Sequence, residues 1–168
     1  MTCAFCNISI ERGFRIVYED NDFVVFQDIA PAARVHVQVV PKKHIGGFGL
    51  VDFSSLFCLT MIPATVRSLN RSDVQLVRSM REIGNKILSD NNTSYDMRKM
   101  GFHIPPFNSI DHLHLHVQAM PYFSRIRAIS YPISKGSGSN HKGVSWFVEV
   151  EQAIQILQSG RRIGILPC

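Results

Sequence analysis

The sequence predicts an α+β domain in which an antiparallel sheet packs against helices. Two β-rich runs joined by a short turn open the chain, a long amphipathic helix occupies its middle, and a strand and a final helix follow. The chain has 168 residues, of which 45% are hydrophobic and 18% charged, and this composition suffices for one folded core. We therefore expect residues 1–168 to form a single domain.

Three strands are predicted in the first part of the chain. The runs FRIVYED and FVVFQDI are rich in β-branched and aromatic residues and meet at the turn sequence EDND, which favours a hairpin. The next run, VHVQVVPKKH, alternates His36 and Gln38 with valines, and Pro41 closes it. Alternation of this kind is typical of a strand with two different faces, so we expect all three runs to share one sheet.

Two helices are predicted, one in the middle of the chain and one near its end. Between Ser72 and Ser89 apolar residues recur at helical spacing, with Asn70 or Ser72 as the N-cap. The run VSWFVEVEQAIQILQSG predicts a short strand or turn followed by a final helix that stops at Gly160.

Between the helices the sequence predicts strands separated by a loop. The run MRKMGF is short and is predicted to be a strand, whereas residues 103–111 are predicted to be a loop because they contain two consecutive prolines. The run HLHLHVQAMP is predicted to be a strand that ends at Pro121.

Two segments depart from this regular pattern. Residues 47–66 form an apolar insertion without clean periodicity. Their uncharged part, residues 53–66, contains Pro63 and is shorter than the roughly 18 to 20 apolar residues that a spanning helix needs, so we expect no membrane partner. Residues 134–143, SKGSGSNHKG, have the composition of a linker and predict a flexible loop.

The N-terminus and the charge restrict the setting of the protein. A basic segment followed by an apolar one, as in a secretory signal, is absent from MTCAFCNISIERG, which favours the cytoplasm or the nucleus and reduced cysteines. The net charge of +5 favours phosphate-bearing ligands. The basic residues occur in scattered pairs such as Lys42–Lys43, so charge alone does not separate a small anionic ligand from nucleic acid.

Three of the seven histidines, His112, His114 and His116, stand at alternate positions of the sequence DHLHLH. Side chains alternate along a strand, so the imidazoles share one face while the leucines between them share the other. Three interpretations follow from the residues alone: an exposed face that carries histidines by chance, a metal site, or catalysis in which a neutral imidazole attacks phosphorus.

These residues resemble the histidine triad superfamily of nucleotide hydrolases and transferases. HLHLHV is similar to its His-x-His-x-His-x signature, and residues 26–45 and 100–116 resemble its flanking segments, most closely in the Hint3 and Hint4 branch. The resemblance implies a histidine triad fold, with one long helix and a C-terminal helix on an antiparallel sheet. It also implies a homodimer that hydrolyses AMP derivatives, adenosine phosphoramidate or adenylyl sulfate, with no nucleic-acid partner and no cofactor needed for catalysis.

The resemblance assigns catalytic roles to four residues. His114 would attack the α-phosphorus and form a nucleotidyl-histidine intermediate, and the main-chain carbonyl of His112 would hold the proton of its other ring nitrogen. His116 would offset negative charge beside the phosphate, or fill the wall of the site as a structural residue. Ser109 would contact the leaving group, although a loop-capping role fits its composition almost equally well.

The resemblance also assigns the nucleotide-binding residues. Asp28 would accept hydrogen bonds from the ribose hydroxyls, start the Asp-Ile-Ala-Pro turn, or do both. Phe26 and Ile29 would form an apolar wall for the base, with Asn108 and Ser109 near the phosphate. His36 would orient the site or be a buried histidine with satisfied hydrogen bonds.

A Cys-x-x-Cys pair, Cys3 and Cys6, is half of a metal signature. The resemblance implies that these thiolates bind a structural zinc ion together with His44 and His112, while the phosphate chemistry is metal-free. The alternative is that the cysteines pack as small buried residues.

Two further functions compete with the metal-free hydrolase. One is a catalytically weak module that binds or senses nucleotides, and the other is a zinc-dependent hydrolase. The identity of the leaving group, whether amine, lysine or sulfate, is left open by the sequence.

Overall fold

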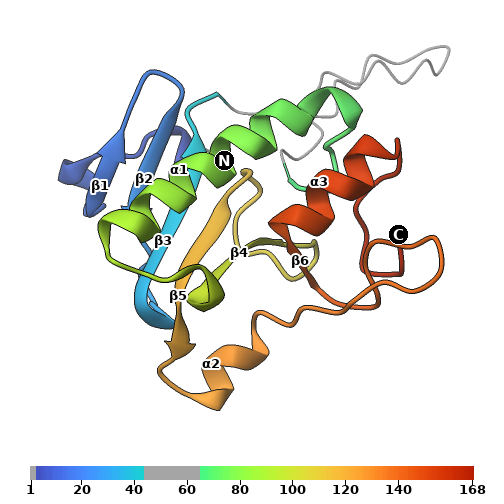
Figure 1. Cartoon of the computed structure of the whole chain (residues 1–168). Coiled ribbons are helices and arrows are strands. Elements are labelled where there is room, and N and C mark those ends of the chain that lie inside the picture. The colour runs from blue at the N-terminus through green and yellow to red at the C-terminus, as the bar shows by residue number, and fades with distance from the viewer. Residues whose placement is uncertain (1–2, 44–64) are drawn as a thin grey trace, which may run out of the picture.

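A six-stranded antiparallel sheet forms the centre of the computed structural model, which describes residues 3–43 and 65–168. Its strand order is β1-β2-β3-β5-β4-β6, as Figure 1 shows. The strands are β1 (Ile16–Glu19), β2 (Phe23–Gln27), β3 (Ala33–Pro41), β4 (Arg98–His103), β5 (Leu115–Tyr122) and β6 (Phe147–Glu149). This arrangement confirms the predicted α+β class with an antiparallel sheet.

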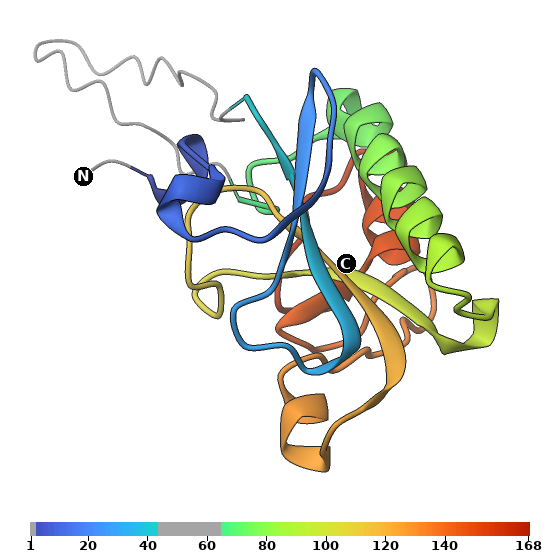
Figure 2. The same cartoon turned by 90° about the vertical axis from the view of Figure 1, so that its left-hand side faces the viewer.

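Helices α1 (Val74–Asp90) and α3 (Val150–Gln158) lie side by side against one face of the sheet (Figure 2). The short helix α2 (Arg125–Ile129) follows β5. Four 3-10 helices complete the described elements: η1 (Ala4–Cys6), η2 (Ile10–Arg12), η3 (Arg71–Asp73) and η4 (Tyr95–Met97). None of the helices in the described part of the chain is long and apolar enough to span a bilayer.

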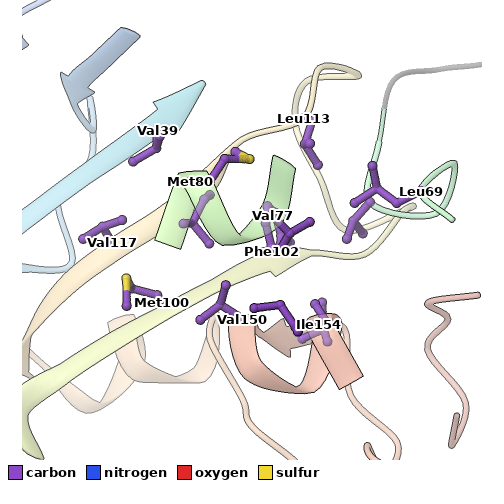
Figure 3. Packing of buried hydrophobic residues seen from close by; sticks show 14 of the residues in the cluster. Val39, Leu69, Val77, Met80, Met100, Phe102, Leu113, Val117, Val150 and Ile154 are labelled. Carbon is purple, nitrogen blue, oxygen red and sulfur yellow. The ribbon is translucent and has the colours of Figure 1, made fainter. Parts of the chain in front are cut away.

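The main core fills the space between the sheet and these two helices. Alternate residues of β3, β4 and β5, such as Val39, Phe102 and Val117, point from the sheet into this core (Figure 3). They meet Met80 of α1 and Ile154 of α3. Because side chains alternate along a strand, the other face of the same three strands carries polar residues, and this is the face on which a site can form.

The long helix is anchored by its cap and by one close approach. Asn70 caps η3: its side chain accepts from the backbone N–H of Ser72 at 2.9 Å, and Asp73 accepts from Asn70 in return. The regular helix therefore begins at Val74, two residues later than predicted from Ser72. At Gly84 a Cβ atom would lie 2.9 Å from the side chain of Val117, so glycine allows α1 to approach β5 closely.

The strand that contains the triad differs from its prediction at both ends. It begins only at Leu115. Before it, Nε2 of His112 donates to the carbonyl of Pro41 at 2.9 Å, so a side chain occupies the acceptor that a strand N–H could otherwise use. It also continues through Pro121, which was predicted to end it, and pairs Tyr122 with Ala33 beyond a register shift that leaves one extra residue in β5. The shift allows pairing to continue around a residue that has no N–H to donate.

Two predicted segments fall partly or wholly outside regular elements. Residues 47–64 of the apolar insertion lie outside the described residues, and its last two, Thr65 and Val66, are buried. The segment 134–143 is closed by a bridge between Lys135 and Lys142 and by a 3.1 Å bond from Gly143 N to Ser134 O. Its flexibility stays a prediction.

Candidate active site

The three imidazoles of the alternating segment lie on the face of the sheet opposite the main core. His112, His114 and His116 are only 1%, 7% and 5% exposed, while Leu113 and Leu115 between them belong to the core. This burial excludes the interpretation that an exposed strand carries histidines by chance. Each buried imidazole must instead be accounted for by a hydrogen-bond partner.

The ring of His114 is held by the backbone of its own segment. Its Nδ1 lies 2.6 Å from the carbonyl oxygen of His112, and a carbonyl can only accept, so Nδ1 carries the proton and Nε2 carries the lone pair. Burial lowers the pKa of His114, although the bond to the carbonyl opposes this shift. The result is a neutral imidazole with one unprotonated nitrogen, the form that can attack an electrophile.

The ring of His116 is bonded to two other imidazoles. Its Nδ1 lies 2.9 Å from Nε2 of His36, and its Nε2 lies 3.1 Å from Nδ1 of His103. Both ring nitrogens are therefore engaged within the protein. This favours the structural role in the wall of the site, because no ring nitrogen of His116 is left to bond a phosphate, and the expected offset of negative charge stays a prediction.

A cavity of about 420 Å³ opens beside His116 on the same face. It is bordered by Asp28, Ile29 and Ser109, three of the residues expected to bind the nucleotide or the leaving group, and by Tyr131 and Trp146. The Ile29 side chain is 100% exposed at this cavity, so it is available for contact with a flat apolar ligand.

The carboxylate of Asp28 combines two of the roles that the sequence left open. Its Oδ1 accepts from the backbone N–H of Ala30 at 2.8 Å, which stabilises the turn. Its Oδ2 accepts from Nε2 of Gln38 at 2.6 Å, and the residue borders the cavity. The turn role is observed, and lone pairs remain for hydroxyl donors of a ligand.

Of the residues expected at the nucleotide, Phe26 lies elsewhere, whereas Asn108 borders a smaller cavity together with His114. Phe26 is on the site face of the sheet but is covered by η1, where its ring packs edge-on against Phe5 at 5.2 Å. Asn108 donates from Nδ2 to Asp111 Oδ1 at 2.8 Å and so stabilises its own loop. Neither residue borders the 420 Å³ cavity.

His114 borders a second and much smaller cavity of about 10 Å³. This space is enough for about one water molecule. His103 borders both cavities, and the loop residues Phe107 to Ser109 lie at their boundary. The loop, His103 and the ring of His116, which lies 5.1 Å from that of His114, therefore separate a ligand seated beside Asp28 from His114.

Comparison with known proteins shows the family of this chain. The family described as "Scavenger mRNA decapping enzyme C-term binding" matches residues 2–51 and 58–130. The chain is 36% identical to the adenosine 5'-monophosphoramidase HINT3 of Xenopus tropicalis, over 95% of this chain and 89% of the relative. It is 39% identical to the bifunctional adenosine 5'-phosphosulfate phosphorylase/adenylylsulfatase HINT4 of Arabidopsis thaliana, over 77% of each chain. The chain belongs to the histidine triad family.

Solved structures agree with this assignment. A histidine triad family hydrolase from Clostridium thermocellum is 27% identical, with a TM-score of 0.55 over 73% of this chain and 94% of that one. A hydrolase of the same family from Legionella pneumophila is 24% identical, with a TM-score of 0.57 over 74% and 97% of the two chains, and supports the fold alone.

In this histidine triad protein the cysteine pair lies beside the first triad histidine. Nδ1 of His112 is 3.5 Å from the sulfur of Cys3 and 3.8 Å from that of Cys6. Nε2 of His112 donates to the carbonyl of Pro41, so the lone pair of Nδ1 faces the two thiols. Two thiols and one imidazole lone pair fit three positions of a zinc site. The expected fourth ligand, His44, lies outside the described residues.

A second set with metal-ligand spacing fails the same test. Donor atoms of Asp28, His36 and His116 all lie within 4.8 Å of one another. The backbone N–H of Ala32, however, donates to Nδ1 of His36 at 3.0 Å, so the proton of that neutral ring sits on Nε2. Nε2 is the atom that faces the other two groups, and a protonated nitrogen cannot bind a metal. This set is a hydrogen-bonded cluster.

Sequence reasoning missed Tyr131 and Trp146 at the cavity, and it also missed two residues that are hydrogen-bonded to predicted ones. His103 was assigned to the loop, yet it ends β4 and contacts His116. Gln38 was recognised only as a polar residue of its strand, yet it binds Asp28. Alternation in MRKMGFH places His103 on the same face as Gly101, and Gly101 pairs with His116, so the strand pattern carried the signal once β4 was placed beside β5.

Proposed function

We propose that the protein hydrolyses a nucleotide in which AMP is joined through nitrogen or sulfate to a small leaving group. The observation that carries the proposal is the 2.6 Å contact between Nδ1 of His114 and the His112 carbonyl, because it leaves Nε2 with a lone pair. The activities for which the two relatives are named, adenosine 5'-monophosphoramidase and adenylylsulfatase, support the substrate class.

The reaction takes two steps at phosphorus. In the first, Nε2 of His114 forms a bond to the α-phosphorus while the bond from phosphorus to the leaving group breaks. A leaving amine takes up one proton, supplied from solvent through the Ser109 hydroxyl at the cavity, whereas sulfate leaves without one. In the second, a water oxygen attacks the same phosphorus, the bond to His114 breaks, and the water proton passes to solvent as AMP is released.

The larger cavity is the proposed seat of the nucleoside. Asp28 would accept the ribose hydroxyls with the lone pairs that Gln38 and the turn leave unused. Ile29, fully exposed at the rim, would contact the base. His112 contributes its main-chain carbonyl to the site. The ring of His116, bonded to His36 and His103, would form part of the wall.

Replacing His114 with Ala tests the mechanism with a fluorogenic adenosine phosphoramidate. We expect kcat to fall by roughly a thousandfold or more, because the attacking atom is gone, while the melting temperature changes little. In the wild-type protein, acid quenching during turnover followed by intact mass measurement should detect one AMP moiety on the chain, lost in His114→Ala. Full turnover by the variant would refute the mechanism.

A nucleotide-binding module is the second candidate, and one observation favours it. His114 borders the 10 Å³ cavity and not the 420 Å³ one, which Asp28 and Ile29 border. If the loop from Phe107 to Ser109 never admits a phosphate to His114, AMP will bind without turnover of any derivative. Calorimetric AMP binding together with zero product from both the phosphoramidate and adenylyl sulfate would select the module.

We also propose that Cys3, Cys6 and His112 hold a structural zinc ion, for which the lone pair of His112 Nδ1 between two thiols is the supporting observation. When bound, zinc would supply a cross-link between the N-terminal segment and the triad segment. The homodimer and the cytoplasmic or nuclear location stay predictions; light scattering after size exclusion and cell fractionation test them.

A further inference from the structure

Three buried imidazoles form a continuous row of hydrogen bonds across the site face of the sheet. The row runs from Ala32 N to His36 Nδ1 (3.0 Å), from His36 Nε2 to His116 Nδ1 (2.9 Å), from His116 Nε2 to His103 Nδ1 (3.1 Å), and from His103 Nε2 to Ser130 O (2.8 Å). It joins β3, β5 and β4 and ends at the residue that follows α2.

The two ends of this row fix the position of every proton in it. The Ala32 amide can only donate and the Ser130 carbonyl can only accept. Each ring between them must therefore accept at Nδ1 and donate at Nε2, so all three are neutral and share one tautomer. Burial favours the same state, because it lowers the pKa of His36 to about 4 and also lowers the pKa of His103 and His116.

The neighbour that matters for the reaction is His114. Its ring centroid is 5.1 Å from that of His116, and its Nε2 lone pair is the proposed nucleophile. If His116 turned its N–H toward this lone pair, the hydrogen bond would mask the attacking nitrogen. In the observed row the N–H of His116 is given to His103 instead.

The geometry points to His103 as a positioning residue of the catalytic site, which accepts the proton of His116 and thereby keeps the nucleophile His114 unmasked. This inference rests on the proposed function. His103 acts through His116, since both of its own nitrogens are engaged. The sequence alone gives it no role.

Packing holds the His103 ring in the orientation that this role requires. The ring meets His116 edge-on at 4.8 Å, lies 5.1 Å from Tyr131, and packs edge-on against Phe147 at 5.2 Å. The Phe147 ring occupies the space where a Cβ at Gly101 would collide with it, so the glycine two residues earlier in β4 is part of the support. His103 therefore cannot leave its partner without displacing two aromatic rings.

Two substitutions separate the hydrogen bonds of His103 from its bulk. In His103→Gln the amide oxygen can accept from His116 and the amide nitrogen can donate to Ser130 O, so both bonds can be kept. His103→Leu removes both. With a fluorogenic adenosine phosphoramidate we expect kcat to fall roughly tenfold to a hundredfold in His103→Leu with KM changed less than twofold, and to recover most of that loss in His103→Gln. His141→Leu, a histidine in the segment 134–143, is the control variant and should match the wild type.

Nitrogen NMR of the imidazoles gives a readout that does not depend on turnover. In wild type and His103→Gln, His116 should show a protonated Nε2 and an unprotonated Nδ1, and in His103→Leu this pattern should be lost or averaged. If the wild type turns over and His103→Leu keeps wild-type kcat, or if Gln is no better than Leu in a folded protein, the inference is wrong. An inactive wild type with the expected tautomers would refute the proposed function and leave the positioning of His116 standing.

Discussion

Two clusters in the described part of the chain each bring three potential metal ligands together, yet they differ in what they can bind. Cys3, Cys6 and His112 form one set, and Asp28, His36 and His116 the other, and in each the donor atoms lie within 4.8 Å of one another. In the first, the far nitrogen of the imidazole faces the carbonyl of Pro41. In the second, the far nitrogen of His36 faces the amide of Ala32.

That single backbone group decides what each cluster can do. A carbonyl draws the proton to the far nitrogen and turns a lone pair toward the cluster, which suits a metal ion. An amide draws a lone pair to the far nitrogen and turns the proton toward the cluster, which suits a carboxylate or another imidazole. The nucleophile follows the first rule, because the carbonyl of His112 leaves His114 with its lone pair outward.

Metal removal should produce the largest difference between the two clusters. We expect zinc in the purified protein near one ion per chain, lost in Cys6→Ser and retained in the matched variant His36→Gln, as measured by plasma emission. Because a structural zinc contributes to folding, EDTA should lower the melting temperature by about 5–10 °C. Turnover of the phosphoramidate at 25 °C should be unchanged.

The opposite pattern would break the comparison. Zinc that disappears in His36→Gln but not in Cys6→Ser would place the metal in the second cluster. Immediate loss of turnover in EDTA, with no change in melting temperature, would indicate the zinc-dependent hydrolase that the sequence left open.

The sequence predicted the face of the sheet on which each triad histidine lies, but not which of its ring nitrogens carries the proton. Alternation along HLHLHV placed Leu113 and Leu115 in the core and the imidazoles opposite, because period-two patterning is local. The partner of His112 is Pro41, 71 residues earlier, and that of His103 is Ser130 beyond a whole strand, so neither tautomer follows from local pattern. Long-range placement decides both.

The same limit explains the contacts that Phe26 and Asn108 make. Phe26 occupies the expected face of β2, but η1 folds over it and Phe5 takes the contact. Asn108 turns back to Asp111 three residues on, which is a loop-capping use that composition had favoured almost equally. For Phe26 the residue type was predicted correctly and the covering segment was not. Asn108 also borders the small cavity together with His114, so its expected place near the phosphate stays a prediction.

A smaller effect is expected from acidification, which should lower the free energy of unfolding through His36 of the second cluster. Burial lowers the pKa of His36 from its ordinary value of 6.5 to about 4, so below pH 6.5 the unfolded chain binds more protons than the folded one. The free energy of unfolding should therefore fall as the pH drops from 6.5 to 4, by about 3 kcal/mol from this residue. Urea unfolding at several pH values, with EDTA throughout to remove any metal contribution, measures the slope. His36→Gln should flatten it, and an equal slope in both proteins would contradict the assignment.

The smallest effect is expected from substitutions of Gln38, which test whether Asp28 binds the ribose hydroxyls of the substrate or a metal ion. Its Nε2 gives Asp28 a 2.6 Å hydrogen bond, while its Oε1 is one of two buried side-chain atoms without a partner in the described part of the chain. In Gln38→Leu the carboxylate loses a donor but a buried unpaired acceptor disappears, so stability should change by less than about 1 kcal/mol. Asp28 would be held less firmly against the cavity, and KM for the phosphoramidate should rise about threefold with kcat unchanged.

Gln38→Glu, the matched variant, places a second acid beside Asp28 and should raise KM further through repulsion. A fall in KM for Gln38→Glu, or new zinc binding by it, would show that Asp28 serves a cation and not the ribose hydroxyls.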